Sequence, residues 1–399
     1  MNINNRNLKT ITGDPQLMRQ INQGLVLNLL RNHKELSRTQ IAELSLLSKP
    51  TISRVINDLL DNDIVIETRE GNSASTGGRK PVMITLNSKG RYVVGVDLGT
   101  TNTVVAMANL KGEIIKKKRV PTNRNHSVEN ILTQVSSMVN EIINESGISR
   151  DLIEGLGVSE AGVVEKETGI IKFSPNFNWK NVNISDLLQE KTRLKTIADN
   201  CTRVMAKGEM WYNTNSKINN LFYVNVGYGI GSSLVINGQV YNNYSEFGHI
   251  PITEKNIKCN CGKTGCLEAV ASGNSIEKKA NQLYSDSNSW LTAKDVFKKA
   301  KNGDKIAIDL FSETGYFLGK GISIVANIFN PDKIIIGGGV SLAGDLLLDP
   351  IRKEFDKNAM KMIKETTKIE NSSLGIEAGV YGAISMVLNH FIFYDSIFK

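Results

Sequence analysis

The chain has 399 residues, 40% of them hydrophobic and 22% charged, and a formal net charge of +8 at pH 7. This length allows two or three folded domains, and the composition is that of a globular protein. No apolar run approaches the length of a membrane span, and the polar N-terminus MNINNRNLKT lacks the apolar region of a secretion signal. We therefore expect a cytoplasmic protein without a membrane partner, and the positive charge permits an anionic partner.

Three capped helices are predicted near the start of the chain. Asp14 followed by proline is typical of a helix start, because Asp accepts a hydrogen bond from a free backbone N–H and proline already has a helical φ angle. Ser37 precedes a short helix over Arg38–Leu44, and Ser48 precedes a third helix that continues to about Leu60. The two short helices with the tight turn between them form a helix-turn-helix pattern.

The third of these helices has an apolar side and a polar, basic side. Ile52, Val55, Ile56 and Leu59 recur at helical spacing, so we expect them to face a core. The opposite side has the short, basic character that a helix needs to read the DNA major groove. The residues predicted to contact DNA from this side are Lys49, Thr51, Ser53, Arg54 and Asn57.

A β-wing is predicted after the third helix. Apolar runs at 64–68 and 82–86 read as two strands around a Gly/Ser-rich loop that ends with Gly78, Arg79 and Lys80, which we expect to meet phosphates or the minor groove. Residues 1–90 carry 12 Lys and Arg residues against 8 Asp and Glu residues, so half of the chain's excess charge lies there. A small helical docking domain with solvated charges is the alternative to a DNA-binding domain.

From residue 91 the chain alternates between apolar strands and amphipathic helices, which predicts an α/β fold. We therefore divide the chain into a winged helix-turn-helix domain at 1–90 and a second domain at 91–399. Residues 92–106 are expected to form two strands joined by a tight glycine turn, and further strands are expected at 153–158, 163–164, 221–226, 232–236 and 333–336. The helices of this domain are expected to cover 127–145, 202–212, 265–281, 306–328 and 378–391.

Three of the four cysteines lie within eight residues, and a histidine precedes them. His249, Cys259, Cys261 and Cys266 form a Cys3His set, a common composition for a closed structural zinc site, so we predict a zinc knot at 249–266. A redox pair, plain buried thiols and an iron–sulfur cluster are alternatives. Cys259 and Cys261 are too close in sequence for an unstrained disulfide, and the usual spacings of cluster ligands are absent.

Five short motifs follow one another in the second domain: DLGTT at 97–101, GYGIG at 227–231, EFGH at 246–249, CNCGKTGCLE at 259–268 and NPDKIIIGGG at 330–339. Their order resembles the ROK family of repressors, open reading frames and sugar kinases. That resemblance implies an actin-like, hexokinase-type domain with two α/β lobes. SRTQIA at 37–42 and GGRKP at 77–81 are similar to the winged heads of the family's repressors.

The resemblance also implies a sugar site. Asn200, Glu246, His249 and Glu268 match the family's sugar ligands, and His249 would hold zinc with one nitrogen and orient the sugar with the other. Cys201 falls where the kinases keep the Asp that deprotonates the sugar hydroxyl, and a thiol is a poor substitute because its unperturbed pKa is about 8.5. No catalytic residue is therefore assigned.

The leading hypothesis is a sugar-responsive transcriptional repressor of carbohydrate-utilisation genes. We expect it to bind operator DNA as a homodimer, or within a larger homo-oligomer, and to be released by a sugar inducer, with xylose, glucose, N-acetylglucosamine and disaccharides as candidates. The alternatives are an ATP-dependent sugar kinase with an accessory DNA-binding head and a repressor that ignores sugars. Trp179 is expected either to line the sugar cleft or to anchor a core.

Overall fold

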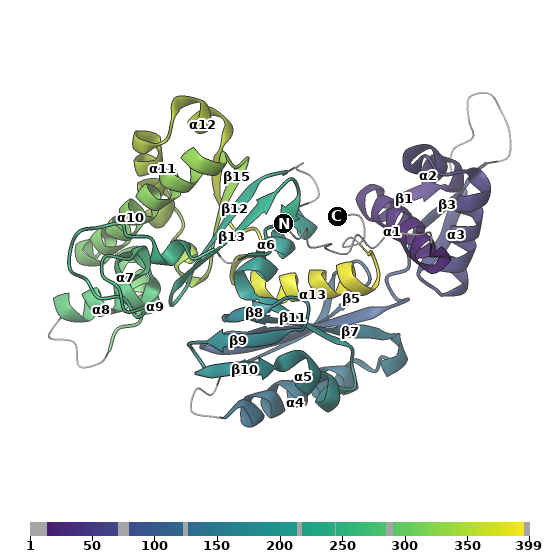
Figure 1. Ribbon diagram of the computed structural model, residues 1–399, viewed down its shortest axis with the longest axis horizontal. Coiled ribbons are helices and arrows are strands. Elements are labelled where there is room, and N and C mark those ends of the chain that lie inside the picture. The colour runs from purple at the N-terminus through teal and green to yellow at the C-terminus, as the bar shows by residue number, and fades with distance from the viewer. Residues whose placement is uncertain are drawn as a thin grey trace, which may run out of the picture.

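The computed structural model describes residues 14–70, 80–122, 127–213, 218–243, 245–284 and 290–394. The N-terminal elements form a small unit, here called the head, at one end of the molecule (Figure 1). Its elements are α1 (Pro15–His33), β1 (Glu35–Ser37), α2 (Arg38–Ser45), α3 (Lys49–Asp61), β2 (Val65–Glu70) and β3 (Val82–Leu86).

The helices of the head begin at the predicted caps. Asp14 accepts a hydrogen bond from the backbone N–H of Gln16 at 2.9 Å, and Ser37 and Gln40 cap each other's backbone N–H groups. Ser48 accepts from the N–H of Thr51 at 3.3 Å. Strand β1 was not predicted. Its three residues are too few to show a period, and pairing with β3 holds them, so that the sheet order is β1-β3-β2.

The first lobe contains a five-stranded sheet in the order β11-β7-β4-β5-β6. Strands β4, β7 and β11 are parallel neighbours, β5 runs antiparallel to β4, and the edge strand β6 runs antiparallel to β5. The elements of this lobe are β4 (Tyr92–Leu98), β5 (Asn102–Asn109), β6 (Ile114–Pro121), α4 (Val128–Ser146), β7 (Ile153–Glu160), β8 (Val163–Glu165), β9 (Ile170–Ser174), β10 (Trp179–Asn183), α5 (Ile184–Thr192) and β11 (Thr196–Asn200).

The second lobe repeats this sheet order with β14-β13-β12-β15-β16, which is the duplicated arrangement expected of an actin-like fold. Its strands are β12 (Leu221–Val226), β13 (Ile230–Ile236), β14 (Gln239–Val240), β15 (Lys333–Gly337) and β16 (Lys368–Asn371). Its helices are α7 (Leu267–Ala271), α8 (Gly273–Leu283), α9 (Ala293–Lys301), α10 (Lys305–Phe329), α11 (Asp345–Asn358) and α12 (Lys361–Thr366). The single helix predicted at 265–281 is divided at Ser272, whose side chain caps α8.

Two helices lie between the sheets. Helix α6 (Cys201–Tyr212) packs on β12 and β13, and α13 (Ala378–Phe391) packs on β4 and β7 (Figure 1). Each lobe has its own apolar core, and Trp179 belongs to the core of the first lobe, where its ring stacks on Phe177 at 4.8 Å between centroids. In the part of the chain that the structure describes, no helix is both long and apolar enough to span a membrane.

Candidate functional site

The carboxyl ends of the three parallel strands of the first lobe bring polar residues together. Asp97 is the second-last residue of β4. It lies opposite Ser159 on the neighbouring strand β7, and Ser159 in turn lies opposite Asp199 on β11. The Ser159 hydroxyl donates to Asp97 Oδ1 at 2.9 Å. Ligands of open α/β sheets bind at this edge, so the fold itself indicates the candidate site.

Asn200 is held rigidly where β11 passes into α6. Its Oδ1 caps α6 by accepting from the N–H groups of Thr202 and Arg203, and its Nδ2 donates to the carbonyl of Gly162 at 2.8 Å. The cap follows from the residue type, because Asn offers an acceptor to the free N–H groups of a helix start. The side chain predicted to bind sugar is therefore positioned by the start of α6 and by the turn between β7 and β8.

Strand β13 of the second lobe contacts the segments that carry three of the predicted sugar ligands. The carbonyl of Ser232 lies 2.9 Å from the Thr202 hydroxyl, next to Asn200. The hydroxyl of Ser232 donates to the carbonyl of residue 245, directly before Glu246, at 3.0 Å, and the N–H of Ile230 donates to Glu268 Oε2 at 2.9 Å. Ligand candidates that are far apart in the sequence are thus gathered at the junction of the two lobes.

His249, Cys259, Cys261 and Cys266 form a cluster that can hold a metal ion, since their ligand atoms all lie within 4.8 Å of one another. Cys259 Sγ is 3.7 Å from His249 Nδ1, and Cys261 Sγ is 3.6 Å from Cys266 Sγ. Tetrahedral Zn–S and Zn–N bonds of about 2.0–2.3 Å require ligand separations of this order. Three thiols and an imidazole therefore fit a structural zinc ion in both chemistry and spacing.

The loop of the cluster closes on itself through the backbone. Ile252 N–H donates to the carbonyl of Gly265 at 2.9 Å, and Leu267 N–H donates to that of Ile250 at 3.0 Å. Gly265 has a φ of +73°, and a Cβ there would lie 2.2 Å from the carbonyl oxygen of Thr253. A side chain at 265 would push Cys266 away from the cluster, which explains the glycine between two ligands.

The two nitrogens of His249 face different groups. Nδ1 points to Cys259, whereas Nε2 lies 3.9 Å from Glu246 Oε2. The side chains of His249 and Glu246 are 30% and 63% exposed, so this side of the cluster is open to a ligand. Glu268 Oε1 lies 4.0 Å from Cys259 Sγ. The metal cluster and three predicted sugar ligands form one continuous surface.

The predicted DNA-contacting residues lie on the outer side of α3. Lys49, Ser53, Arg54 and Asn57 are exposed and Thr51 is half-buried, whereas Ile52, Val55, Ile56 and Leu59 are buried. Lys80, two residues before β3, is exposed, and Gly78 and Arg79 lie outside the described residues. The sequence reasoning missed Arg38, the first residue of α2, whose guanidinium donates to Glu67 at 2.8 Å and to Asn57 at 3.3 Å.

A sequence model of the ROK family matches residues 93–390, most of the chain. The chain belongs to the ROK family. A model of the MarR family matches residues 19–74, within the head. The glucokinase of Halalkalibacterium halodurans is 37% identical over 73% of this chain and 93% of its own length. The xylose repressor of Caldicellulosiruptor bescii is 30% identical over 94% of this chain and 98% of its own length.

Among solved structures, a ROK family transcriptional regulator described as a homolog of the E. coli MLC protein has the same fold. It covers 96% of this chain and 99% of its own, with a TM-score of 0.80 and 24% sequence identity. Because the match extends over the whole molecule, it confirms the predicted fold class, a winged helix-turn-helix head followed by an actin-like ROK domain with two lobes.

Cys201 and Asp199 flank Asn200 in this ROK domain, and the pKa values of both are shifted. Burial raises the pKa of the Cys201 thiol far above its ordinary value, and the carboxylates of Asp97 and Glu160 raise it further. Burial also tends to raise the pKa of Asp199, but the neighbouring Lys207 and Arg203 outweigh it and hold that pKa below its usual value. Lys207 Nζ is 2.6 Å from Asp199 Oδ2, so this carboxylate already forms an ion pair.

Two acids near Cys201, the half-buried Asp97 and the buried Glu160, are further features of the site. Burial raises the pKa of Asp97 to about 6, although the hydrogen bond from Ser159 and the charge of Arg119 lower it. Burial raises the pKa of Glu160 to about 7. The Ser174 hydroxyl, which donates a hydrogen bond to Glu160 Oε1 at 2.6 Å, lowers this pKa in part. Sequence reasoning missed Glu160. A charged residue at the end of an apolar strand was the available signal.

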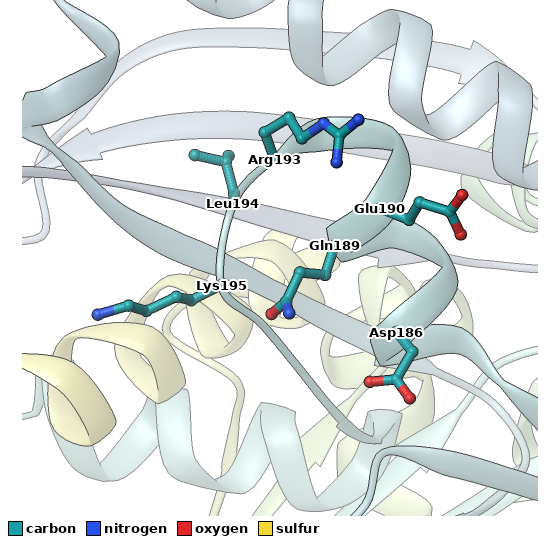
Figure 2. Close-up of a pocket in the computed structure, with 6 residues that line it drawn as sticks. All are labelled: Asp186, Gln189, Glu190, Arg193, Leu194 and Lys195. Atoms are coloured by element: carbon teal, nitrogen blue, oxygen red, sulfur yellow. The ribbon is translucent and has the colours of Figure 1, made fainter.

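A hollow on the outside of the first lobe is separate from this site. It is lined by residues of α5 and of the segment between α5 and β11, namely Asp186, Gln189, Glu190, Arg193, Leu194 and Lys195 (Figure 2). Lys195 precedes the amino end of β11, whereas Asn200 is at its carboxyl end. The hollow therefore lies at the opposite edge of the parallel sheet from the one where ligands of such sheets bind.

Proposed function

We propose that this ROK protein is a sugar-responsive transcriptional repressor that has lost kinase activity. The loss of kinase activity is proposed from the two side chains that flank Asn200. Cys201, at the position where ROK kinases keep their catalytic Asp, has a pKa raised far above neutrality, and Asp199 is engaged by Lys207 and Arg203. Neither of these two residues then offers a free carboxylate to deprotonate a sugar hydroxyl.

Operator DNA is the proposed partner of the head. We assign residues 1–90 to DNA binding and 91–399 to sugar binding, with major-groove contacts from Lys49, Thr51, Ser53, Arg54 and Asn57 and wing contacts from Gly78, Arg79 and Lys80. The exposed polar side of α3 and the MarR-family match support this assignment. A homodimer would present two α3 helices to a palindromic site, as two-fold half-sites require.

The proposed effector is a sugar held by Asn200, Glu246, His249 and Glu268. A sugar offers hydroxyl donors to the carboxylates and acceptors to the amide and imidazole, which gives each of these groups a partner. D-Xylose leads the candidates, because the relative from Caldicellulosiruptor bescii is a xylose repressor. We propose that the sugar releases the protein from its operator.

Zinc is the metal proposed for His249, Cys259, Cys261 and Cys266. A bound zinc ion would cross-link the loop between β14 and α7 and contribute to folding free energy. The protein residues then hold His249 with Nδ1 toward the cluster, which leaves Nε2 for the sugar. In this role the metal is structural and takes no part in a reaction.

The 37% identity to a glucokinase favours a second candidate, an ATP-dependent sugar kinase with an accessory head. Two measurements decide between the candidates. In a thermal-shift screen with D-xylose, D-glucose, N-acetyl-D-glucosamine and maltose, we expect at least one sugar to raise the melting temperature, since a ligand of the native state stabilises it. A coupled assay of ADP release with ATP and the same sugars should show no turnover. Sustained turnover would contradict the proposal.

A further inference from the structure

Helix α6 connects the candidate sugar site to the head. It begins at Cys201, directly after Asn200, and ends with Trp211 and Tyr212. Trp211 is only 5% exposed, and the guanidinium carbon of Arg31, on helix α1 of the head, lies 3.9 Å from the centroid of its ring. One helix therefore has its first turn in the sugar site and its last turn under the head.

Helix α13 makes a second connection to the head. A Cβ on Gly379, in its first turn, would lie 2.3 Å from the carboxyl carbon of Asp97 at the candidate site. Beyond its last turn, Phe393 packs edge-on against Trp211 at 4.9 Å, and its carbonyl accepts from Asn28 Nδ2 on α1 at 3.2 Å. One apolar core includes residues of α1, Trp211 and the end of α13, so the head and the ROK domain are packed together there.

The two helices touch each other through their backbones. A Cβ on Gly208 of α6 would lie 3.0 Å from the Cα of Gly382 in α13, and a Cβ on Gly382 would lie 2.1 Å from the carbonyl oxygen of Val204. Contacts this close leave little room for sliding, because protein interiors are packed without space for independent shifts. The pair therefore moves as one body.

The start of α6 is also tied to the second lobe. Thr202 contacts the carbonyl of Ser232, and Gly231 lies against the Thr202 methyl group. We expect a sugar that contacts Asn200 from one lobe and Glu246 or Glu268 from the other to shift the lobes relative to each other, and α6 lies at their junction. A displacement at its first turn reaches Trp211 because a helix is stiff along its axis.

We propose that the contact between Arg31 and Trp211 transmits sugar binding to the DNA-binding head. This inference rests on the proposed function. The contact holds the head in the arrangement that binds the operator, and the sugar-bound form of the ROK domain breaks it. Because coupling is reciprocal, the contact also opposes sugar binding, and its removal must tighten the affinity for sugar.

The test uses the full-length protein and the substitution Arg31→Met, which keeps an apolar stem of similar length and removes the cation over the ring. The matched control is Arg19→Met, on the same helix, where the lost ion pair with Asp58 at 3.1 Å lies within the head. Operator affinity is measured by fluorescence anisotropy on a duplex selected from a random library, with and without saturating D-xylose, D-glucose, N-acetyl-D-glucosamine or maltose. Sugar affinity is measured on DNA-free protein by calorimetry.

In the unsubstituted protein we expect sugar to weaken operator binding by about tenfold or more, within the usual range of allosteric coupling. In Arg31→Met this effect should fall below about threefold and the sugar should bind about threefold tighter, in line with the loss of a desolvated cation–π contact. Arg19→Met should keep the full sugar effect, and Asn28→Ala should reduce it in part.

Two results separate the failure of this inference from that of the proposed function. If Arg31→Met keeps both the sugar effect on operator binding and the sugar affinity of the unsubstituted protein, the inference is wrong and the proposed function stands. If no sugar of the thermal-shift screen, maltose included, changes operator binding by the unsubstituted protein, the proposed function fails and the inference with it. Should Arg31→Met bind no operator, its sugar affinity still decides, and an unchanged value contradicts the inference.

Discussion

The substitution Glu160→Gln is expected to stabilise the protein at pH 8 and to leave its stability unchanged near pH 4. The side chain of Glu160 is fully buried, and burial raises its pKa from 4.5 to about 7. Below pH 4.5 the carboxyl is protonated in both the folded and the unfolded chain, so it contributes no difference. Above pH 7 it is ionised in both, and the folded protein carries the whole cost of a buried charge.

The size of the effect follows from the two pKa values. A difference of about 2.5 between them corresponds to about 3 kcal/mol, which the folded protein loses progressively as the pH rises from 4.5 to 7. Glutamine is neutral and can still accept the hydrogen bond from Ser174, so it avoids this loss. Glu160→Gln should therefore raise the free energy of unfolding by about 3 kcal/mol at pH 8.

The assay is urea unfolding followed by circular dichroism at pH 4, 6 and 8, in which the free energy is extrapolated linearly to zero urea. Glu190→Gln, on the exposed end of α5, is the matched control and should change stability by less than about 0.5 kcal/mol at each pH. A gain that is equal at all three pH values, or a loss at pH 8, would refute the reasoning.

Three further predictions concern the metal, the ion pair and the DNA surface. Cys266→Ser should abolish stoichiometric zinc binding, measured with a chromophoric chelator, and lower the melting temperature by more than about 5 °C. Lys207→Met removes one of the two cations on the buried Asp199 carboxylate and should cost about 3 kcal/mol in urea unfolding. Arg54→Ala should weaken operator binding by about 1–3 kcal/mol in anisotropy titrations and leave the sugar-induced thermal shift unchanged.

Features fixed by neighbouring residues could be predicted from the sequence. The caps Asp14, Ser37 and Ser48 act within a few residues, so their patterns indicate the helix starts directly. The cysteine cluster was found for the same reason, since its thiols lie within eight residues of sequence. Strand β1, by contrast, forms because β3 pairs with it. The three residues of β1 give no sequence signal that predicts this pairing.

The parts of the site that depend on distant partners could not be predicted. The contact of Arg31 with Trp211 joins residues 180 positions apart, and nothing in their local sequences indicates it. The raised pKa of Glu160 likewise comes from burial, which only the folded chain creates.

The central claim, that a sugar controls operator binding by this protein, is tested most directly by one anisotropy titration. The full-length protein is titrated into a labelled operator duplex at constant ionic strength, because protein–DNA affinity depends strongly on salt. The titration is repeated with the sugar that gives the largest thermal shift. We predict that the sugar weakens operator binding at least about tenfold. Equal operator affinity with and without that sugar would contradict the account.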